Sequence, residues 1–348
     1  MRTKKVPRRF EPLFIAGVRR SSLSGRSGRP ARSRTRPGRR YAAPALRSSR
    51  VVRRVALGAA IVGFVAPVVR RRLSIPRPVT SVLAWQAPLS LALVLPASRA
   101  RDAAVYGAQM WAYVAHYEMP NDDPDELIRR VRVDYPIRVD RAIGLGEVPT
   151  VRLQRALGRP GEVLAHDKAL SIVHWAWFFA PHTAVLWILL RHPSRFPGAA
   201  AQMAAVFDAG AAVYWLVPTA PPWWAANAGA LPRVRRIMTE TGERVWGSHW
   251  KRLYDSLSGN QLAAMPSLHF ATSVMAAHVL SDAGRAPGAV GWAYAGTLAL
   301  ALVYLGEHYV TDLLAGLALT EAVRRAAPVA TPAARALAGW VRSMEPAA

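Results

Sequence analysis

The chain has 348 residues, 52% of them hydrophobic and 19% charged, and its formal net charge at pH 7 is +25. The charges collect between long apolar runs, a distribution typical of a polytopic membrane protein and not of a water-soluble one. Because the sequence contains no cysteine, disulfide bonds, thiolate catalysis and metal sites built on cysteine are excluded.

The first 54 residues carry much of the positive charge, and Glu11 is their only acid. They are rich in Arg, Ser, Pro and Gly and hold too few apolar residues to bury a core, so we expect a disordered cytoplasmic tail over 1–54. A basic block ahead of the first apolar run agrees with the positive-inside rule. Aromatic residues that would stack on bases are scarce among the arginines, so we expect no nucleic-acid partner.

The apolar runs predict an all-α fold, a polytopic bundle of about six or seven transmembrane helices. A bilayer core about 30 Å thick requires roughly 20 apolar residues per helix. The run 55–69 is set aside because it is short, contains Pro67 and is flanked by arginines. The predicted spans are 79–97, 103–117, 169–190, 199–217, 267–280, 290–305 and 309–322.

The segments between these runs complete the predicted domain organisation. N-terminal membrane helices occupy 55–120, and an interfacial linker of helical pieces is expected over 121–166, where acids and arginines nearly balance. A core with the candidate chemistry covers 167–325 and includes a polar loop over 218–265. A C-terminal tail follows over 326–348.

One candidate motif opens the predicted span 267–280, in the sequence Pro266-Ser267-Leu268-His269. Proline suits the first turn of a helix, where a missing N–H costs nothing. The free backbone N–H groups of that turn attract anions. We therefore expect Ser267 and His269 to meet a bound phosphate.

A second motif, Gly306 to Asp312, opens the last predicted span. His308 and Asp312 are four residues apart and share a helical face. A carboxylate at that spacing accepts a proton from one ring nitrogen, which leaves the other nitrogen nucleophilic. An unpaired carboxylate in an apolar run is costly, so a partner is expected for Asp312.

The predicted topology brings the two motifs to one side of the membrane. Each histidine begins a span of the same direction, and the single span 290–305 joins them. The proline-rich segment 217–224 ends the preceding ascending span on that side. Three segments therefore converge on one pocket, which points to phosphoryl transfer through a histidine nucleophile.

These motifs resemble those of the type 2 phosphatidic acid phosphatase superfamily, and most closely its inositol phosphorylceramide synthase (inositolphosphotransferase) branch. The resemblance covers roughly residues 165–325. Pro266-Ser267-Leu268-His269 matches the second motif of that branch, 306–316 matches the third, and Ala220-Pro221-Pro222-Trp223 resembles the proline-rich first motif.

The resemblance implies a mechanism without metal or other cofactor. His308 would attack phosphorus, Asp312 would orient it and stabilise its imidazolium, and His269 would protonate the leaving oxygen. The phosphohistidine would then pass to an alcohol, which makes the protein a phosphotransferase, or to water, which makes it a phosphatase. The branch favours transfer of a phosphorylated headgroup to an alcohol.

One departure concerns phosphate binding. The broader superfamily carries a Ser-Arg pair upstream of the nucleophile, where this chain has Ala301 and Leu302. The loop 218–265 offers other guanidinium groups, and we expect Arg233 and Arg236 to bind phosphate together with Ser267.

Other polar residues of the spans receive a structural interpretation. His174, His182 and His278 lie on apolar helices without an acid at helical spacing, so packing or an interface position is expected for them. Asp167 stands at the mouth of its helix, where it caps the helix or shapes the pocket.

Two alternatives to an enzyme of this kind remain open. The missing arginine suits a non-catalytic lipid-binding membrane protein, and a vanadate-dependent haloperoxidase would share the anion pocket. We expect a phosphorylated lipid and the membrane as partners, and leave the oligomeric state open. The composition suggests a bacterial plasma membrane, with the active site on the extracytoplasmic face if 55–69 spans and on the inner face if it does not.

Overall fold

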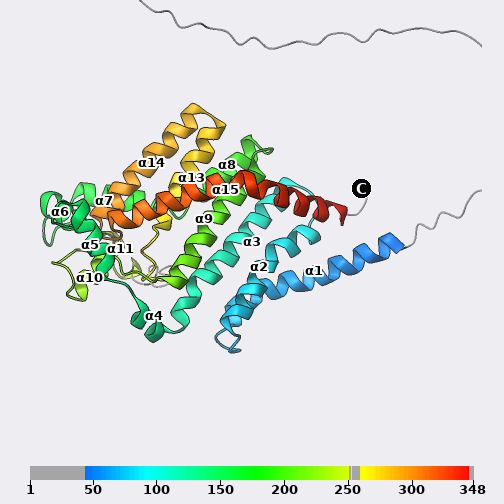
Figure 1. The fold of residues 1–348 in the computed structure, drawn as a ribbon, viewed down its shortest axis with the longest axis horizontal. Coiled ribbons are helices and arrows are strands. Elements are labelled where there is room, and N and C mark those ends of the chain that lie inside the picture. Colours follow the sequence, from blue (N-terminus) through cyan, green and yellow to red (C-terminus); the bar gives the residue numbers. More distant parts are fainter. Residues whose placement is uncertain (1–43, 251, 253–258, 345–348) are drawn as a thin grey trace, which may run out of the picture. The chain divides into compact units, whose positions relative to one another are not determined.

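The computed structural model describes residues 44–250, 252 and 259–344. These residues form helices and connecting loops, and the part of the chain so described contains isolated β-bridges but no named strand (Figure 1). The predicted all-α class is confirmed. Most of the predicted disordered tail lies outside the described residues, but its last part, from Pro44, is the start of a helix.

Three helices form the N-terminal part and pack in sequence order: α1 (Pro44–Val69), α2 (Arg77–Val94) and α3 (Arg99–Glu118). A Cβ on Gly63 of α1 would lie 2.6 Å from the carbonyl oxygen of Leu83, so the first two helices approach closely. Valines on the outer face of α1 are exposed, as expected for side chains that meet lipid.

Short helices fill the predicted linker. They are η1 (Met119–Asp122), α4 (Pro124–Arg130), α5 (Asp134–Ile143) and α6 (Pro149–Leu157). Ile137 of α5 and Val148 ahead of α6 pack in one cluster with Leu231 and Tyr309. The linker therefore packs against the residues that precede the last helix.

The predicted span 169–190 is broken into two helices, α7 (Ala165–Ala176) and α8 (Ala180–Arg191), which meet at a bend of 50°. Pro181 occupies the first turn of α8 and has no N–H to continue a ladder of hydrogen bonds from α7. The N–H of Trp177 bonds instead to the carbonyl of His174, three residues back. The two helices together cover the predicted span, and the apolar length on which the prediction rested gave no sign of the break ahead of this proline.

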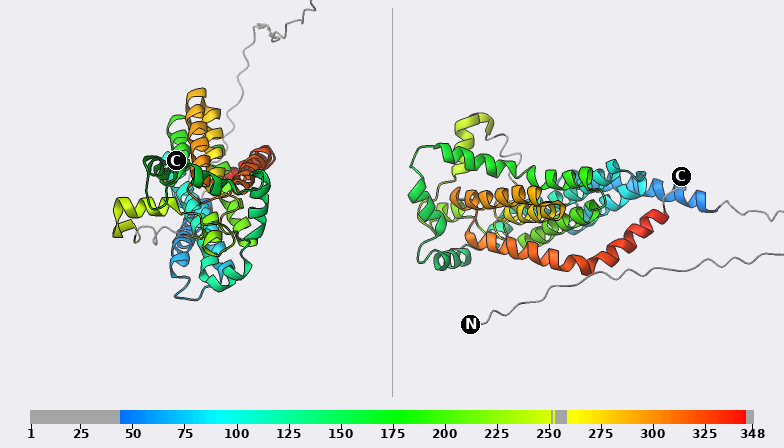
Figure 2. Two further views of the ribbon diagram at one scale, coloured as in Figure 1. Left: turned by 90° about the vertical axis from the view of Figure 1, so that its left-hand side faces the viewer. Right: turned by 90° about the horizontal axis from the view of Figure 1, so that it is seen from above.

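The remaining helices are α9 (Phe196–Leu216), α10 (Pro222–Asn227), α11 (Ile237–Trp246), α13 (Leu268–Ala283), α14 (Arg285–Tyr304) and α15 (Val310–Ser343). The predicted polar loop 218–265 thus contains α10 and α11. The last helix continues well beyond its predicted end at residue 322 and includes most of the predicted C-terminal tail. Figure 2 shows that α15 bends along its second half, where it contains Pro328 and Pro332.

The predicted number of six or seven spans is not confirmed. Among the described residues, three helices are long and apolar enough to cross a membrane: Arg50–Val69, Phe196–Leu216 and Arg285–Tyr304. The bent pair α7 and α8 makes a fourth if it counts as one span. The run 55–69, set aside above, belongs to the first of these helices. By contrast α13 has 16 residues, or about 24 Å at 1.5 Å per residue, which is shorter than a bilayer core.

Helix α13 lies at the centre of the core and contacts α8, α9, α14 and α15. Two glycines allow these contacts. A Cβ on Gly210 of α9 would lie 2.5 Å from the side chain of Leu268, and one on Gly316 of α15 would lie 2.7 Å from the carbonyl oxygen of Ser267. The backbones of α13 and α15 therefore meet where the two histidine motifs begin.

Replacing Gly316 with alanine is expected to destabilise the protein by about 1–2 kcal/mol, because the new methyl group meets backbone that cannot move aside. Gly296 is the matched control, since a Cβ there meets no atom within 4 Å. G296A should leave stability unchanged or raise it by up to about 1 kcal/mol, the helix-propensity gain. Thermal unfolding of both variants in detergent measures the difference, and an equal melting temperature for the two would contradict the packing argument.

Candidate active site

Backbone hydrogen bonds tie the three predicted motifs together. Thr219 of the proline-rich segment forms β-bridges with Arg132 of the linker and with Ala263 ahead of the second motif. The N–H of Trp223 donates to the carbonyl of Gly306 at 3.2 Å. The N–H of Ser267 donates to the carbonyl of Asp312 at 2.9 Å. Segments far apart in sequence thus meet at the start of α13 and α15.

The imidazole of His308 lies between the other two candidate catalytic side chains. Its Nδ1 is 3.3 Å from Oδ2 of Asp312, and its Nε2 is 3.1 Å from Nδ1 of His269. His308 and Asp312 are buried, at 4% and 0% exposure. The sequence predicted that the two rings would meet across an anion, whereas here they contact each other directly.

Asp312 is held by the first turn of α15. Its Oδ2 also accepts the N–H of Tyr309 at 2.9 Å, in the manner of a capping box. Asp140 of α5 accepts the N–H groups of Val310 at 3.0 Å and Thr311 at 2.8 Å. The negative Asp140 at the positive end of the helix fixes that turn. Sequence reasoning missed Asp140, because nothing local to it indicates a partner 170 residues away.

The turn that presents His308 requires glycine at position 306. Gly306 has a φ of +84°, and a Cβ there would lie 2.6 Å from the carbonyl oxygen of Arg235. The N–H groups of Glu307 and His308 both donate to the carbonyl of Leu302 at 3.1 Å. The side chain of Leu302 is fully buried in an apolar cluster, so this residue anchors the turn through its backbone.

The two predicted phosphate-binding arginines differ in their surroundings. Arg236 donates to both carboxylate oxygens of Glu307, at 2.9 and 3.2 Å, and its guanidinium lies 4.0 Å from the ring centroid of Trp223. Arg236 thus joins the proline-rich motif to the residue before His308. Arg233 is exposed, and the structure does not bring it to the histidines.

Glu307 is ionised in this arrangement. Burial alone would raise the pKa of its carboxyl, but the charge and hydrogen bonds of Arg236 outweigh burial and hold that pKa below its usual range. The guanidinium and carboxylate therefore form a mostly buried ion pair beside the histidines.

Ser267 lies at the site as predicted, but its groups already have partners. Its side chain accepts the N–H of Phe270 at 3.3 Å and caps α13, while its own N–H is used by Asp312. The structure therefore gives Ser267 a role in joining α13 to α15, and a contact of this residue with phosphate stays a prediction.

The three other histidines of the spans, of which only His174 is buried, differ from one another. His182 contacts the hydroxyl of Tyr106 at 3.0 Å, and His278 contacts the carboxylate of Glu321 at 2.7 Å. Both have the satisfied packing expected of them, although the acid for His278 comes from another helix. His174, from the last turn of α7, lies instead in the site, with its ring centroid 4.9 Å from that of His269. The sequence signal for it was only a costly polar residue within an apolar run.

Asp167 has the capping role that was one of its two predicted functions. Its Oδ2 accepts the N–H of Leu164 at 2.8 Å at the start of α7, and its Oδ1 accepts the hydroxyl of Tyr304 at 2.5 Å. This fully buried carboxylate therefore joins α7 to the end of α14.

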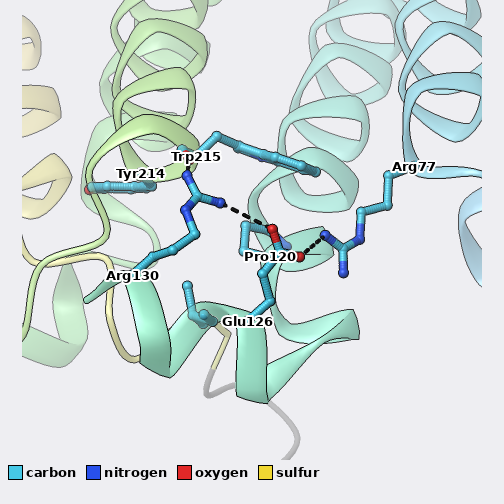
Figure 3. Close-up of a pocket in the computed structure, with 7 residues that line it drawn as sticks. Arg77, Pro120, Glu126, Arg130, Tyr214 and Trp215 are labelled. Carbon is cyan, nitrogen blue, oxygen red and sulfur yellow. Dashed lines mark hydrogen bonds and ion pairs between the residues drawn. The ribbon is translucent and has the colours of Figure 1, made fainter.

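Two depressions on the protein surface do not contain the histidines. Figure 3 shows the smaller, where Glu126 pairs with Arg77 and Arg130 beside Trp215. Its volume of about 10 Å³ suits a single water molecule. A larger groove of about 520 Å³ runs beside Trp224.

A family model described as the PAP2 superfamily matches residues 137–324. The matched stretch begins in α5 and ends in α15, so it includes the histidine motifs, Asp140 and His174. Comparison of the chain with curated proteins and with solved structures found no match.

The pair of Glu307 and Arg236 predicts a pH effect on stability. The pKa of Glu307 is lower in the folded protein than in the unfolded chain, so its ionised carboxylate stabilises the fold fully above the ordinary pKa of about 4.3. This contribution to the free energy of unfolding is lost as the pH falls through the folded pKa. E307Q should be less stable than the wild type at pH 7 by about 1–3 kcal/mol, since Arg236 loses its charged partner, and should lose less stability on acidification.

Thermal unfolding in detergent between pH 7 and pH 3 tests this expectation. E162Q serves as control, because Glu162 and its partner Arg159 are both exposed and such a pair is worth little. Parallel pH curves for the wild type and E307Q would show that the carboxylate has an ordinary pKa.

Proposed function

Because the chain belongs to the PAP2 superfamily, we propose that it is an integral membrane phosphotransferase that moves a phosphorylated headgroup from a lipid to an alcohol through a phosphohistidine intermediate. The superfamily comprises phosphatases and phosphotransferases. The apolar helices, long enough to cross a bilayer, support a membrane location and hence a lipid substrate.

The observation that carries the proposal is the position of the His308 ring between a carboxylate and a second imidazole. A carboxylate on Nδ1 favours the tautomer with the proton on that nitrogen. The lone pair of Nε2 then accepts the Nδ1–H of His269. This pattern supplies a nucleophilic nitrogen on one ring and an acidic N–H on the other.

In the first half-reaction, phosphate would enter between the two rings and break their contact. Nε2 of His308 forms a bond to phosphorus while the bond from phosphorus to the leaving oxygen breaks. His269 enters the step as an imidazolium, passes its Nδ1 proton to that oxygen and becomes neutral, while Asp312 stabilises the positive His308 ring. All of these steps use side chains that the fold already holds together.

In the second half-reaction, an acceptor hydroxyl attacks phosphorus, and the bond from phosphorus to Nε2 of His308 breaks as the new oxygen–phosphorus bond forms. The hydroxyl proton passes to the neutral His269 ring, which restores its imidazolium. The likeness of the motifs to the inositolphosphotransferase branch favours an alcohol such as an inositol or lipid hydroxyl as acceptor. Water as acceptor gives the alternative, a lipid phosphate or pyrophosphate phosphatase. The mechanism we propose needs no metal or other cofactor in either case.

Binding of the phosphate is assigned to Arg236 and, from the exposed loop, Arg233, with Ser267 at the start of α13. Arg236 is the better supported, since its partner Glu307 directly precedes His308. A planar guanidinium with five donors can share its hydrogen bonds between a carboxylate and a phosphate.

The proposed location is a bacterial plasma membrane, with the site on the extracytoplasmic face. Support comes from α1, whose segment Arg50–Val69 is among the helices suited to span. The basic tail ahead of it then lies in the cytoplasm by the positive-inside rule.

Loss of the nucleophile should abolish turnover. We expect H308A to lower the rate at least about 10³-fold, and D312N and H269A to lower it about 10²- to 10⁴-fold. H278Q is the matched control, because His278 lies on the same helix as His269 but is bonded to Glu321, and it should turn over like the wild type. The assay is product formation by the reconstituted protein, together with mass spectrometry of a phosphorylated His308 peptide.

Several outcomes distinguish this mechanism from others. Lipid binding without turnover would favour the non-catalytic lipid-binding alternative, which the apolar Leu302 motivates. Turnover that survives H308A would refute the histidine nucleophile. Halide oxidation in the presence of vanadate would favour the haloperoxidase alternative.

The acceptor is identified by a panel of phospholipids and polyprenyl phosphates, each incubated with and without free inositol. A phosphotransferase should form a new phosphodiester that depends on the added alcohol, detected by mass spectrometry. Release of inorganic phosphate at the same rate with or without the alcohol would identify a phosphatase instead.

A further inference from the structure

His174 is a buried imidazole at the catalytic cluster that the mechanism above does not use. Its side chain is 4% exposed. The centroid of its ring lies 4.9 Å from that of His269. The ring centroid of Trp177, three residues further along the chain, lies 4.2 Å from that of His269. The break between α7 and α8 therefore brings the end of α7 against the start of α13.

Both ring nitrogens of His174 lack a hydrogen-bond partner among the described residues. A buried polar group without a partner costs roughly 1–3 kcal/mol, and native proteins rarely leave one without a reason. His182 and His278, partly buried histidines of neighbouring helices, each have a partner. His174 is thus the exception, and it is the one that lies at the site.

The surroundings of His174 contain groups of both charge signs. It is within electrostatic range of the carboxylate of Glu307, which Arg236 pairs, and of His308 and Arg236. The position where the broader superfamily resemblance would place an arginine is occupied by Leu302, which is buried in an apolar cluster. That position therefore offers a phosphate oxygen no donor, and the ring of His174 has nitrogen atoms without a partner among the described residues.

We propose that His174 is a third imidazole of the phosphate pocket, whose N–H donates to a non-bridging oxygen of the bound phosphoryl group. This inference rests on the proposed function. It assigns to His174 of α7 the role of hydrogen-bond donor to phosphate that an arginine would fill at the position of Leu302. A phosphate oxygen supplies a partner for a ring that has none among the described residues, so the cost of burying the imidazole is offset in the complex. His174 contacts the substrate and does not take part in bond formation.

The test is the affinity of the purified full-length protein for inorganic phosphate and orthovanadate, measured by calorimetric titration. H174L replaces the imidazole with an apolar side chain that still fills space and removes the N–H donor. We therefore expect the affinity for each anion to fall about tenfold or more. H174Q retains one N–H donor and should recover much of the affinity. H182L is the matched control, because His182 is partly buried on the next helix and bonded to Tyr106, and it should bind both anions like the wild type.

Unchanged anion affinity in folded H174L would overturn the inference, and so would a wild type that binds neither anion. The proposed function would be refuted by a different result, namely the absence of turnover by the wild type with every lipid donor tested. Equal losses in H174L and H182L would show a packing effect and would also count against His174 as a phosphate ligand.

A second measurement avoids the risk that H174L does not fold. The chain has nine histidines, so the imidazole ¹⁵N spectrum of the wild type, labelled on histidine, is simple. Addition of orthovanadate should shift three imidazoles, those of His174, His269 and His308. A shift confined to the imidazoles of His269 and His308 would exclude His174 from the pocket.

Discussion

The hydrogen bond between His308 and Asp312 is the interaction on which the rest of the site depends. Both side chains are buried, and a buried carboxylate is tolerated only with partners. The fold supplies them through the first turn of α15, which Asp140 caps from the linker. The turn at Gly306 and the close approach of α13 at Gly316 then set where the ring of His308 meets that of His269.

Much of the candidate site could be predicted because the sequence features that indicate it lie within a few residues of one another. His308 and Asp312 are one helical turn apart, and the proline and serine before His269 mark a helix start, so short-range geometry indicated both. The direction of successive spans then indicated that they meet. The all-helical class followed from the apolar runs, whose number and charged borders exclude a soluble fold.

What the sequence could not indicate depends on contacts between distant segments. Asp140 caps a helix that begins 170 residues later, and His174 reaches the site only because α7 ends at a bend ahead of Pro181. Nothing in the sequence offered a structural reason to distinguish Arg233 from Arg236. The structure distinguishes them, because Arg236 contacts Glu307 and Trp223. The span count was uncertain for another reason, since a helix such as α13 gains its burial from neighbouring helices and needs less length and hydropathy of its own.

The direct contact between the rings of His269 and His308 has a consequence for the chemistry proposed for them. In the proposed tautomer, Nε2 of His308 accepts a hydrogen bond from His269 at 3.1 Å, so its electron pair is engaged. A ligand must displace that neighbour before the pair becomes available to attack. The proposed mechanism therefore favours oxyanions, whose oxygens can replace the lost hydrogen bond, over neutral molecules.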